Sequence, residues 1–252
     1  MPTCLKAPFF LFYRGVGKEQ RNERMTGRQT YTAEFDELHV IGEQLYQLYE
    51  EGTLTEEQVE EEIETYLIHA YRNGYRIGEE DLDLDSADIA FFEDEIKAHP
   101  EWLESSLERK IDGKTFRDRL SEHLANKDGS GIVGTLLASE YHRNTNEGIT
   151  GLGNAIGDVL AGGTGGRFAG SLLNKTWVGV MDDVERDSHV YLEGMTIPFG
   201  SDFYTYNGDH APFPGMFGKA EEDINCRCIT KLSFAGISKE AVHAKVGQVT
   251  GK

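Results

Sequence analysis

The sequence predicts an α+β protein, with a helical N-terminal domain followed by a compact C-terminal α+β domain that has a short, irregular sheet. Three observations predict it. Apolar residues recur at three- and four-residue steps through the first half of the chain, which is the period of a helix. The second half alternates short aromatic and β-branched segments with glycine and proline turns. A glycine-containing hinge, Lys127-Asp-Gly-Ser-Gly, separates the two halves.

The hinge is the central boundary among four predicted regions of the 252-residue chain. Residues 1–31 form an N-terminal arm, and residues 32–126 form an acidic helical domain. Residues 130–234 form the C-terminal domain, and residues 235–252 form a tail. The length is ample for two small hydrophobic cores.

The acidic helical domain begins with a predicted helical hairpin. A helix over residues 32–51 is capped by Thr32, and a second helix runs from residue 55 to Asn73-Gly74. The short link between them favours an antiparallel pair.

Two further helices are expected in this domain. One runs from residue 85 to the residue before Pro100. The other runs from about Pro100 to residue 123, with a break near Gly113.

Charge is distributed unevenly along the chain, which has a net charge of −19. The arm carries about +4, residues 32–104 carry about −20, and the remainder carries about −3. The acidic block would repel a nucleic-acid backbone, so we interpret it as a solvated helical face. No apolar run reaches the roughly 18 residues of a membrane span, and three cysteines make no disulfide framework. We therefore expect no membrane contact and a reducing compartment.

A glycine- and alanine-rich stretch over residues 148–170 follows a predicted helix over residues 132–146. It contains Gly-Gly-Thr-Gly-Gly-Arg but lacks the Gly-Lys-Ser/Thr ending of a phosphate-binding loop. Two alternatives are a flexible loop and close helix packing through small residues.

The C-terminal domain concentrates the polar residues that carry chemistry. Residues 175–183 predict a strand, and residues 186–192 predict a short helix that Gly194 ends. Residues 225–230 predict a short closing strand.

In these segments the chain resembles the C-terminal domain of phage Mu F-like minor head proteins, the head morphogenesis family of tailed phages. The resemblance covers roughly residues 130–234 and includes Ser139-Glu140, Asn144 and Asn146 on the preceding helix. It rests on an ordered set of residues: Lys-x-Trp ending at Trp177, Asp182, Arg-Asp-Ser-His over 186–189, Gly194, Phe203, the proline-rich turn at 212–214, and Asn-Cys-Arg-Cys over 225–228.

The resemblance implies a minor head (capsid) structural protein of a tailed phage or prophage. It implies action in head morphogenesis near the portal, with roles in DNA packaging or ejection, and no enzymatic activity. The implied partners are the portal and other capsid or scaffold proteins, and the implied location is the head interior of the virion, after assembly in the host cytoplasm. If phage DNA is bound, the basic arm is the candidate segment.

Three interpretations of the C-terminal polar residues compete, and we favour a structural one without catalytic residues. In it, Arg227 forms a bidentate ion pair with Asp182 or Asp187, and the Asn225 side chain ties down a turn. The residues expected to form this structural core are Trp177, Asp182, Arg186, Asp187, His189, Gly194, Asn225, Cys226, Arg227 and Cys228.

The second interpretation is a zinc site, and the third is catalysis. His189, Cys226 and Cys228, with His210 as a further candidate, would supply the nitrogen and sulfur ligands that zinc prefers. Alternatively, His189 and neighbouring carboxylates would act as acid and base, with a cysteine as nucleophile, in a head-packaged nuclease or transferase. The carboxylates in question are Asp182, Asp183, Asp187 and Glu193.

Overall fold

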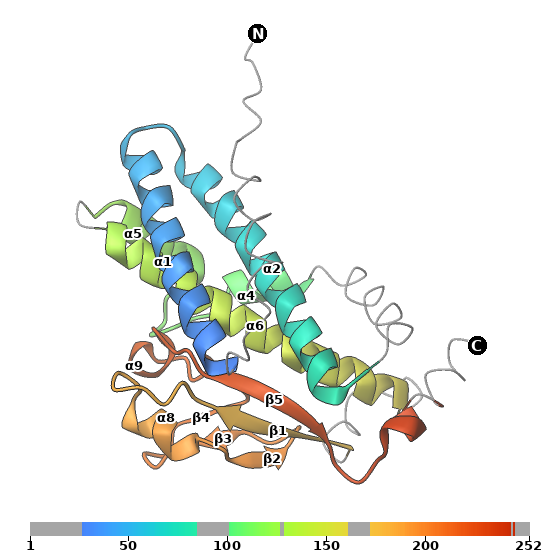
Figure 1. Ribbon diagram of the computed structural model, residues 1–252. Coiled ribbons are helices and arrows are strands. Elements are labelled where there is room, and N and C mark those ends of the chain that lie inside the picture. Colours follow the sequence, from blue (N-terminus) through green and yellow to red (C-terminus); the bar gives the residue numbers. More distant parts are fainter. Residues whose placement is uncertain (1–26, 85–100, 127–128, 161–171, 243, 245–252) are drawn as a thin grey trace.

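The computed structural model describes residues 27–84, 101–126, 129–160, 172–242 and 244. Helices form one layer and a small antiparallel sheet forms the other (Figure 1). This arrangement confirms the predicted α+β fold class. None of the described helices is long and apolar enough to cross a membrane.

Three long helices build the helical layer: α1 (Gly27–Glu50), α2 (Glu56–Leu82) and α6 (Ser130–Leu160). The helices α1 and α2 form the predicted hairpin, and α6 packs along both of them (Figure 1). Helix α1 begins at Gly27 rather than at Thr32, so the end of the predicted arm is helical. Helix α2 begins at the Thr55 capping box, in agreement with the sequence.

Helix α2 continues past Asn73-Gly74, where the sequence analysis ended it, to Leu82. The glycine has a packing role instead, because a Cβ at position 74 would collide with the backbone carbonyl of Thr145 in α6. In the same way, a Cβ at Gly148 of α6 would collide with the carbonyl of Tyr71. Glycine at both positions therefore allows the two helix backbones to approach each other closely.

This contact decides between the two alternatives for the first part of the glycine-rich stretch. Residues 148–160 are the last turns of α6 and pack against α2. Residues 161–170 lie outside the described residues, as does the helix expected over residues 85–99.

Two short helices, α4 (Glu101–Leu107) and α5 (Phe116–Leu124), replace the fourth predicted helix. The predicted break near Gly113 is confirmed: Asp112 and Gly113 have φ of 48° and 81°, and Thr115 starts α5 with a capping box.

The sheet has β1 (Leu173–Val178) at its centre, between β2 (Thr196–Pro198) and β5 (Ile229–Phe234), with antiparallel pairing on both sides. A separate two-stranded ribbon pairs β3 (Phe203–Tyr204) with β4 (His210–Ala211). Strand β1 is shorter than the predicted 175–183 segment. The closing strand begins after Cys228 and not at Asn225, so the Asn-Cys-Arg-Cys segment is an extended loop that leads into β5.

Buried apolar residues form three clusters. The first lies among α1, α2, α5 and the first half of α6, and the second lies between the helices and the sheet. The third surrounds Trp177 and contains Leu192, Phe203, Cys226 and Cys228. Because α6 shares the first cluster, packing crosses the boundary predicted between residues 126 and 130. The division into domains stays a prediction.

Candidate metal centre

The site forms where two segments meet beside β1. One is α8 (Asp187–Leu192), a short helix that Gly194 follows with a φ of 74°. The other is the loop of residues 225–228, which enters β5 after α9 (Ala220–Asp223). The pairing of β5 with β1 places Trp177 opposite Thr230. The loop therefore runs beside Trp177, and its two cysteines belong to the third cluster.

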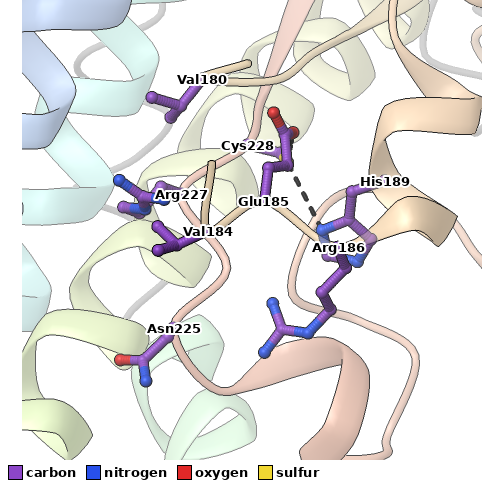
Figure 2. Close-up of a pocket in the computed structure, with 8 residues that line it drawn as sticks. All are labelled: Val180, Val184, Glu185, Arg186, His189, Asn225, Arg227 and Cys228. Atoms are coloured by element: carbon purple, nitrogen blue, oxygen red, sulfur yellow. Dashed lines mark hydrogen bonds between the residues drawn. The ribbon is translucent and has the colours of Figure 1, made fainter. Parts of the chain in front are cut away.

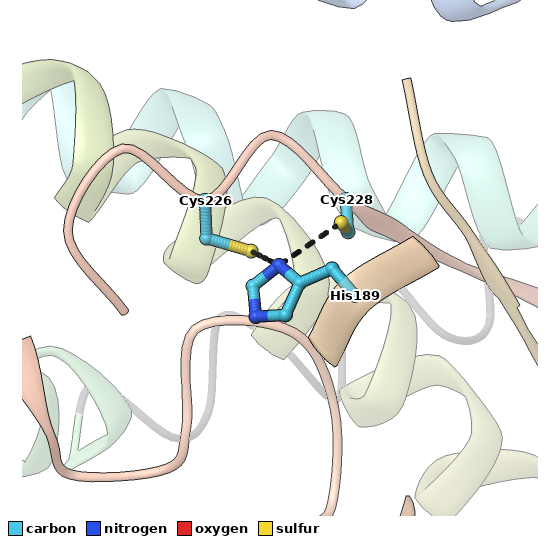
Figure 3. Close-up of side chains that lie close together, drawn as sticks. All are labelled: His189, Cys226 and Cys228. Carbon is cyan, nitrogen blue, oxygen red and sulfur yellow. Dashed lines mark hydrogen bonds between the residues drawn. The ribbon is translucent and has the colours of Figure 1, made fainter. Parts of the chain in front are cut away.

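His189, Cys226 and Cys228 converge at this junction (Figure 3). The His189 Nδ1 atom is 3.8 Å from Cys226 Sγ and 3.5 Å from Cys228 Sγ. None of the three residues is more than 4% exposed. A tetrahedral zinc ion with bonds of about 2.3 Å to sulfur and 2.0 Å to nitrogen separates neighbouring ligand atoms by about 3.5–3.8 Å. The three side chains therefore form a group that could hold a metal ion.

The three groups also shift one another's pKa values. The hydrogen bond from Cys228 lowers the pKa of Cys226 well below its ordinary value, and His189 lowers it further against the opposing effect of burial. The same interaction with Cys226, together with burial, raises the pKa of Cys228. Burial lowers the pKa of His189, but the hydrogen bond and charge of Cys226 raise it by more. Cys226 is therefore the cysteine that favours the thiolate form, which is the form that binds metals and acts as a nucleophile.

A carboxylate lies behind the histidine. Glu222 Oε2 is 3.1 Å from His189 Nε2, an ion-pair distance without the alignment of a hydrogen bond, and it accepts a hydrogen bond of 2.8 Å from Ser188 Oγ. A carboxylate next to the far nitrogen favours a proton there, so Nδ1 is left to face the cysteines.

Aromatic side chains hold the imidazole ring from two sides. The Trp177 ring meets it edge to face with 5.3 Å between centroids, and the Phe217 ring stacks on it at 5.9 Å. Trp177 is fully buried. These contacts restrict the orientation of His189 as well as its position.

Helix α6 clamps the cysteine loop. The Asn146 side-chain amide donates to the carbonyl of Cys228, and its oxygen accepts from the amide of Thr230. Ser139 Oγ accepts a 2.9 Å hydrogen bond from the amide of Asn225. Two of the α6 residues noted in the resemblance, Ser139 and Asn146, therefore contact the loop directly.

Glu140 and Asn144 belong to a neighbouring buried network. The Glu140 carboxylate lies between the guanidinium groups of Arg119 and Arg143. Burial raises its pKa, but the two arginines lower it by more, so the pKa is below its ordinary value. Asn144 Oδ1 accepts from Ser106 Oγ, which connects α6 to α4.

The predicted ion pair of Arg227 exists, and its partner is Asp182. Both terminal nitrogens of Arg227 contact the Asp182 carboxylate, at 2.5 and 2.7 Å. Arg186 donates to the carbonyl of Ile224, and the amide of Gly194 donates to the carbonyl of Trp177. Asn225 shapes its turn through a positive φ of 59°.

Other expected members of the site lie outside the histidine–cysteine group. His210 is exposed and contacts Asp202, so it is not a ligand candidate. Asp183 and Asp187 are exposed, and Glu193 accepts a hydrogen bond from the amide of Gly179. The carboxylates that do adjoin the group are Glu185 and Glu222. Neither can be singled out from the sequence, because each lies in an acidic run whose members look equivalent without the fold.

Comparison with known proteins gives one informative match. Over 68 residues the chain is 40% identical to a protein of Enterococcus faecalis named NAD(+)--arginine ADP-ribosyltransferase EFV. The match covers 27% of this chain, and the chain spans 14% of the length of that relative. No family model matches the chain. No solved structure matches it either.

This match corrects one expectation from the sequence. The resemblance implies no enzymatic activity, whereas the matching relative is named as an ADP-ribosyltransferase.

Proposed function

We propose that the chain is a minor head protein of a tailed phage or prophage, acting in head morphogenesis near the portal. One observation carries the proposal. The residues on which the resemblance rests come from separate segments of sequence, yet Trp177, His189, Cys226 and Cys228 pack into one buried cluster. A family pattern of this kind is expected where several segments must meet to define one fold.

The proposed partners are the portal and other capsid or scaffold proteins. The acidic residues of α2 support docking onto a basic protein surface, because Glu57 and Glu61 are exposed on the helical layer. The proposed location is the head interior of the virion, after assembly in the host cytoplasm. Contact with phage DNA is assigned to the basic residues of the N-terminal arm.

The test is the protein content of purified phage heads. Quantitative mass spectrometry of particles from the encoding phage is expected to detect the chain at low copy number, and cross-linking is expected to join it to the portal protein. Charge reversal of exposed acidic residues on α2, as in Glu57→Lys with Glu61→Lys, should weaken this cross-link. Heads that lack the chain and assemble normally without it would contradict the proposal.

We also propose that His189, Cys226 and Cys228 bind zinc, which supports the fold by joining α8 to the loop that enters β5. Two sulfur ligands and one imidazole suit zinc, and the spacing of the ligand atoms fits a tetrahedral ion. Elemental analysis of the purified chain should find zinc at about one ion per chain. The double variant Cys226→Ser/Cys228→Ser should lose it, whereas Cys4→Ser should retain it. A zinc-free wild-type protein that also fails to take up added zinc would refute this part.

A second candidate function is transfer of ADP-ribose from NAD to arginine. The 68-residue match to the transferase of Enterococcus faecalis supports it, and the small share of that relative that is matched leaves the activity itself to be measured. Purified chain incubated with radiolabelled NAD and an arginine-containing acceptor should label the acceptor. Absence of labelling, with an active transferase as a parallel positive control, would argue against this candidate.

A further inference from the structure

We propose that Glu185 is the fourth ligand of the zinc site and closes it to exogenous ligands. The inference rests on the proposed zinc binding by His189, Cys226 and Cys228. Those residues account for three corners of a tetrahedron, and zinc sites differ in what supplies the fourth. A fourth protein ligand makes the site a closed structural centre, whereas a water molecule makes it an open and reactive one.

A small hollow lies beside two of the three proposed ligands. His189 and Cys228 line the hollow on one side, and there is room in it for about one water molecule. The remaining lining residues are Val180, Val184, Glu185, Arg186, Asn225 and Arg227 (Figure 2). The valines carry no ligand atoms, and guanidinium groups do not ligate cations. Asn225 is exposed and its neutral amide is a weak ligand for zinc. Glu185 is the remaining candidate.

The Glu185 carboxylate is already held next to one of the sulfur atoms. Its Oε1 atom accepts a hydrogen bond from Cys228 Sγ at 3.3 Å, close to the sulfur–oxygen spacing of about 3.5 Å expected on a tetrahedral ion. When zinc replaces the thiol proton, the oxygen that accepted that proton lies close to the ion. In the structure the carboxylate is outside the compact group of three, so ligation requires its side chain to rotate into the hollow.

The surrounding backbone holds this carboxylate beside the group, in the position from which it would rotate into the hollow. Glu185 Oε2 accepts a hydrogen bond from the amide of Met181, and a Cβ at Gly179 would collide with Glu185 Oε1. Glycine at position 179 therefore leaves the space that the carboxylate uses. The backbone amide of Glu185 donates to the carbonyl of Asp182, which fixes the start of the side chain.

The charge of the site is compatible with a carboxylate ligand. Zinc with two thiolates and a neutral imidazole has no net charge, so ligation by Glu185 leaves one negative charge. The guanidinium of Arg227, although paired with Asp182, also lies within electrostatic range of Glu185 and moderates that charge. Arg186 is a second cation on the same hollow.

The test uses the full-length chain and cobalt(II), which reports on the ligands of a zinc site through its visible spectrum. Three variants are compared with wild type: Glu185→Gln, which keeps the size of the side chain, Glu185→Ala, and Asp183→Asn as a control on an exposed carboxylate of the same loop. Zinc affinity is measured by competition with a chromophoric chelator. Circular dichroism of the metal-free proteins checks that the variants fold.

Both Glu185 variants are expected to bind zinc at least tenfold more weakly than wild type, because loss of a ligand should cost no less than loss of an outer-shell partner. The Asp183→Asn variant should stay within twofold. Added azide should change the cobalt spectrum of Glu185→Ala and leave that of wild type unchanged.

The inference is overturned if wild type responds to azide and Glu185→Gln keeps full zinc affinity, since the fourth ligand is then solvent. That result leaves the three-residue site intact. In contrast, zinc binding that is absent from wild type, or that survives loss of both cysteines, overturns the zinc proposal itself together with this inference.

Discussion

Single residues near His189 decide which of its nitrogen atoms faces the cysteines. Glu222 is 5% exposed and its Oε2 atom lies 3.1 Å from Nε2, whereas its neighbour Glu221 is exposed. A buried carboxylate here orients the ring and raises its basicity, which is the usual role of an outer-shell partner.

Glu222→Gln is therefore expected to weaken zinc binding by about tenfold, because the charge that favours a proton on Nε2 is lost. Glu221→Gln changes the same charge on the exposed side of α9 and should have no effect. Competition with a chelator measures both. Equal affinities for the two variants would show that Glu222 does not orient the histidine.

Ionisation of Asp81 is expected to make the stability of the fold depend on pH. Asp81 accepts a 3.0 Å hydrogen bond from the amide of Leu232 in β5, and burial raises its pKa to about 6. An ordinary aspartate ionises near pH 4. The folded state thus binds this proton more tightly than the unfolded state, so Asp81 contributes a stability that is present at low pH and lost as pH rises through about 6.

Asp81→Asn keeps an oxygen acceptor for Leu232 and removes the ionisation. At pH 8 we expect the variant to be more stable than wild type by about 1–2 kcal/mol, allowing for partial exposure of the side chain. At pH 4 the difference should shrink towards zero. Urea unfolding at the two pH values measures it, and an equal difference at both would show that ionisation is not the cause.

Glycines allow the helices α2 and α6 to pack closely, and one of these glycines made the predicted end of α2 wrong. The pattern Asn73-Gly74 is typical of a helix end. The sequence alone does not show that the other helix, α6, packs against this position, where its backbone at Thr145 fills the space of the missing side chain. A glycine needed for tertiary packing and a glycine that ends a helix therefore look the same until the partner helix is known.

Gly74→Ala tests this packing. Although alanine favours a helix over glycine by about 1 kcal/mol, its Cβ would collide with the carbonyl of Thr145. We expect a net loss of about 2–3 kcal/mol in the free energy of unfolding. Gly131→Ala is the matched control in α6, because its Cβ would meet only Glu43 Oε1 at 3.9 Å. That variant should be neutral or slightly stabilised. Chemical denaturation of both variants gives the comparison.

At the scale of the whole molecule, periodic and capped segments were predictable and long-range partners were not. The hairpin of α1 and α2, the break at Gly113 and the short helix before Gly194 follow from local patterns. The ion pair of Arg227 with Asp182 was named as one of two options. Glu185, Glu222 and the Asn146 clamp depend on contacts between distant segments, and an acidic run gives no sign of which carboxylate will be buried.

With zinc bound as proposed, the same long-range convergence would make stability depend on the metal. Zinc would tie α8 to the loop that enters β5, and α6 holds that loop through Asn146. The ion would therefore stabilise the contact between the helical layer and the sheet. A ligand that binds only the folded state stabilises it by about 2.7 kcal/mol when the free ligand concentration is 100 times the dissociation constant. For a protein of this length that corresponds to a rise of roughly 5–10 °C in the melting temperature.

We therefore expect a chelator to lower the melting temperature of the zinc-loaded protein by roughly 5–10 °C, and added zinc to restore it. Cys226→Ser/Cys228→Ser should melt at one temperature with or without chelator, whereas Cys4→Ser should behave like wild type. Differential scanning calorimetry measures all three. A wild-type melting temperature that ignores the chelator would mean that hydrogen bonds and aromatic packing around His189 hold the junction without an ion.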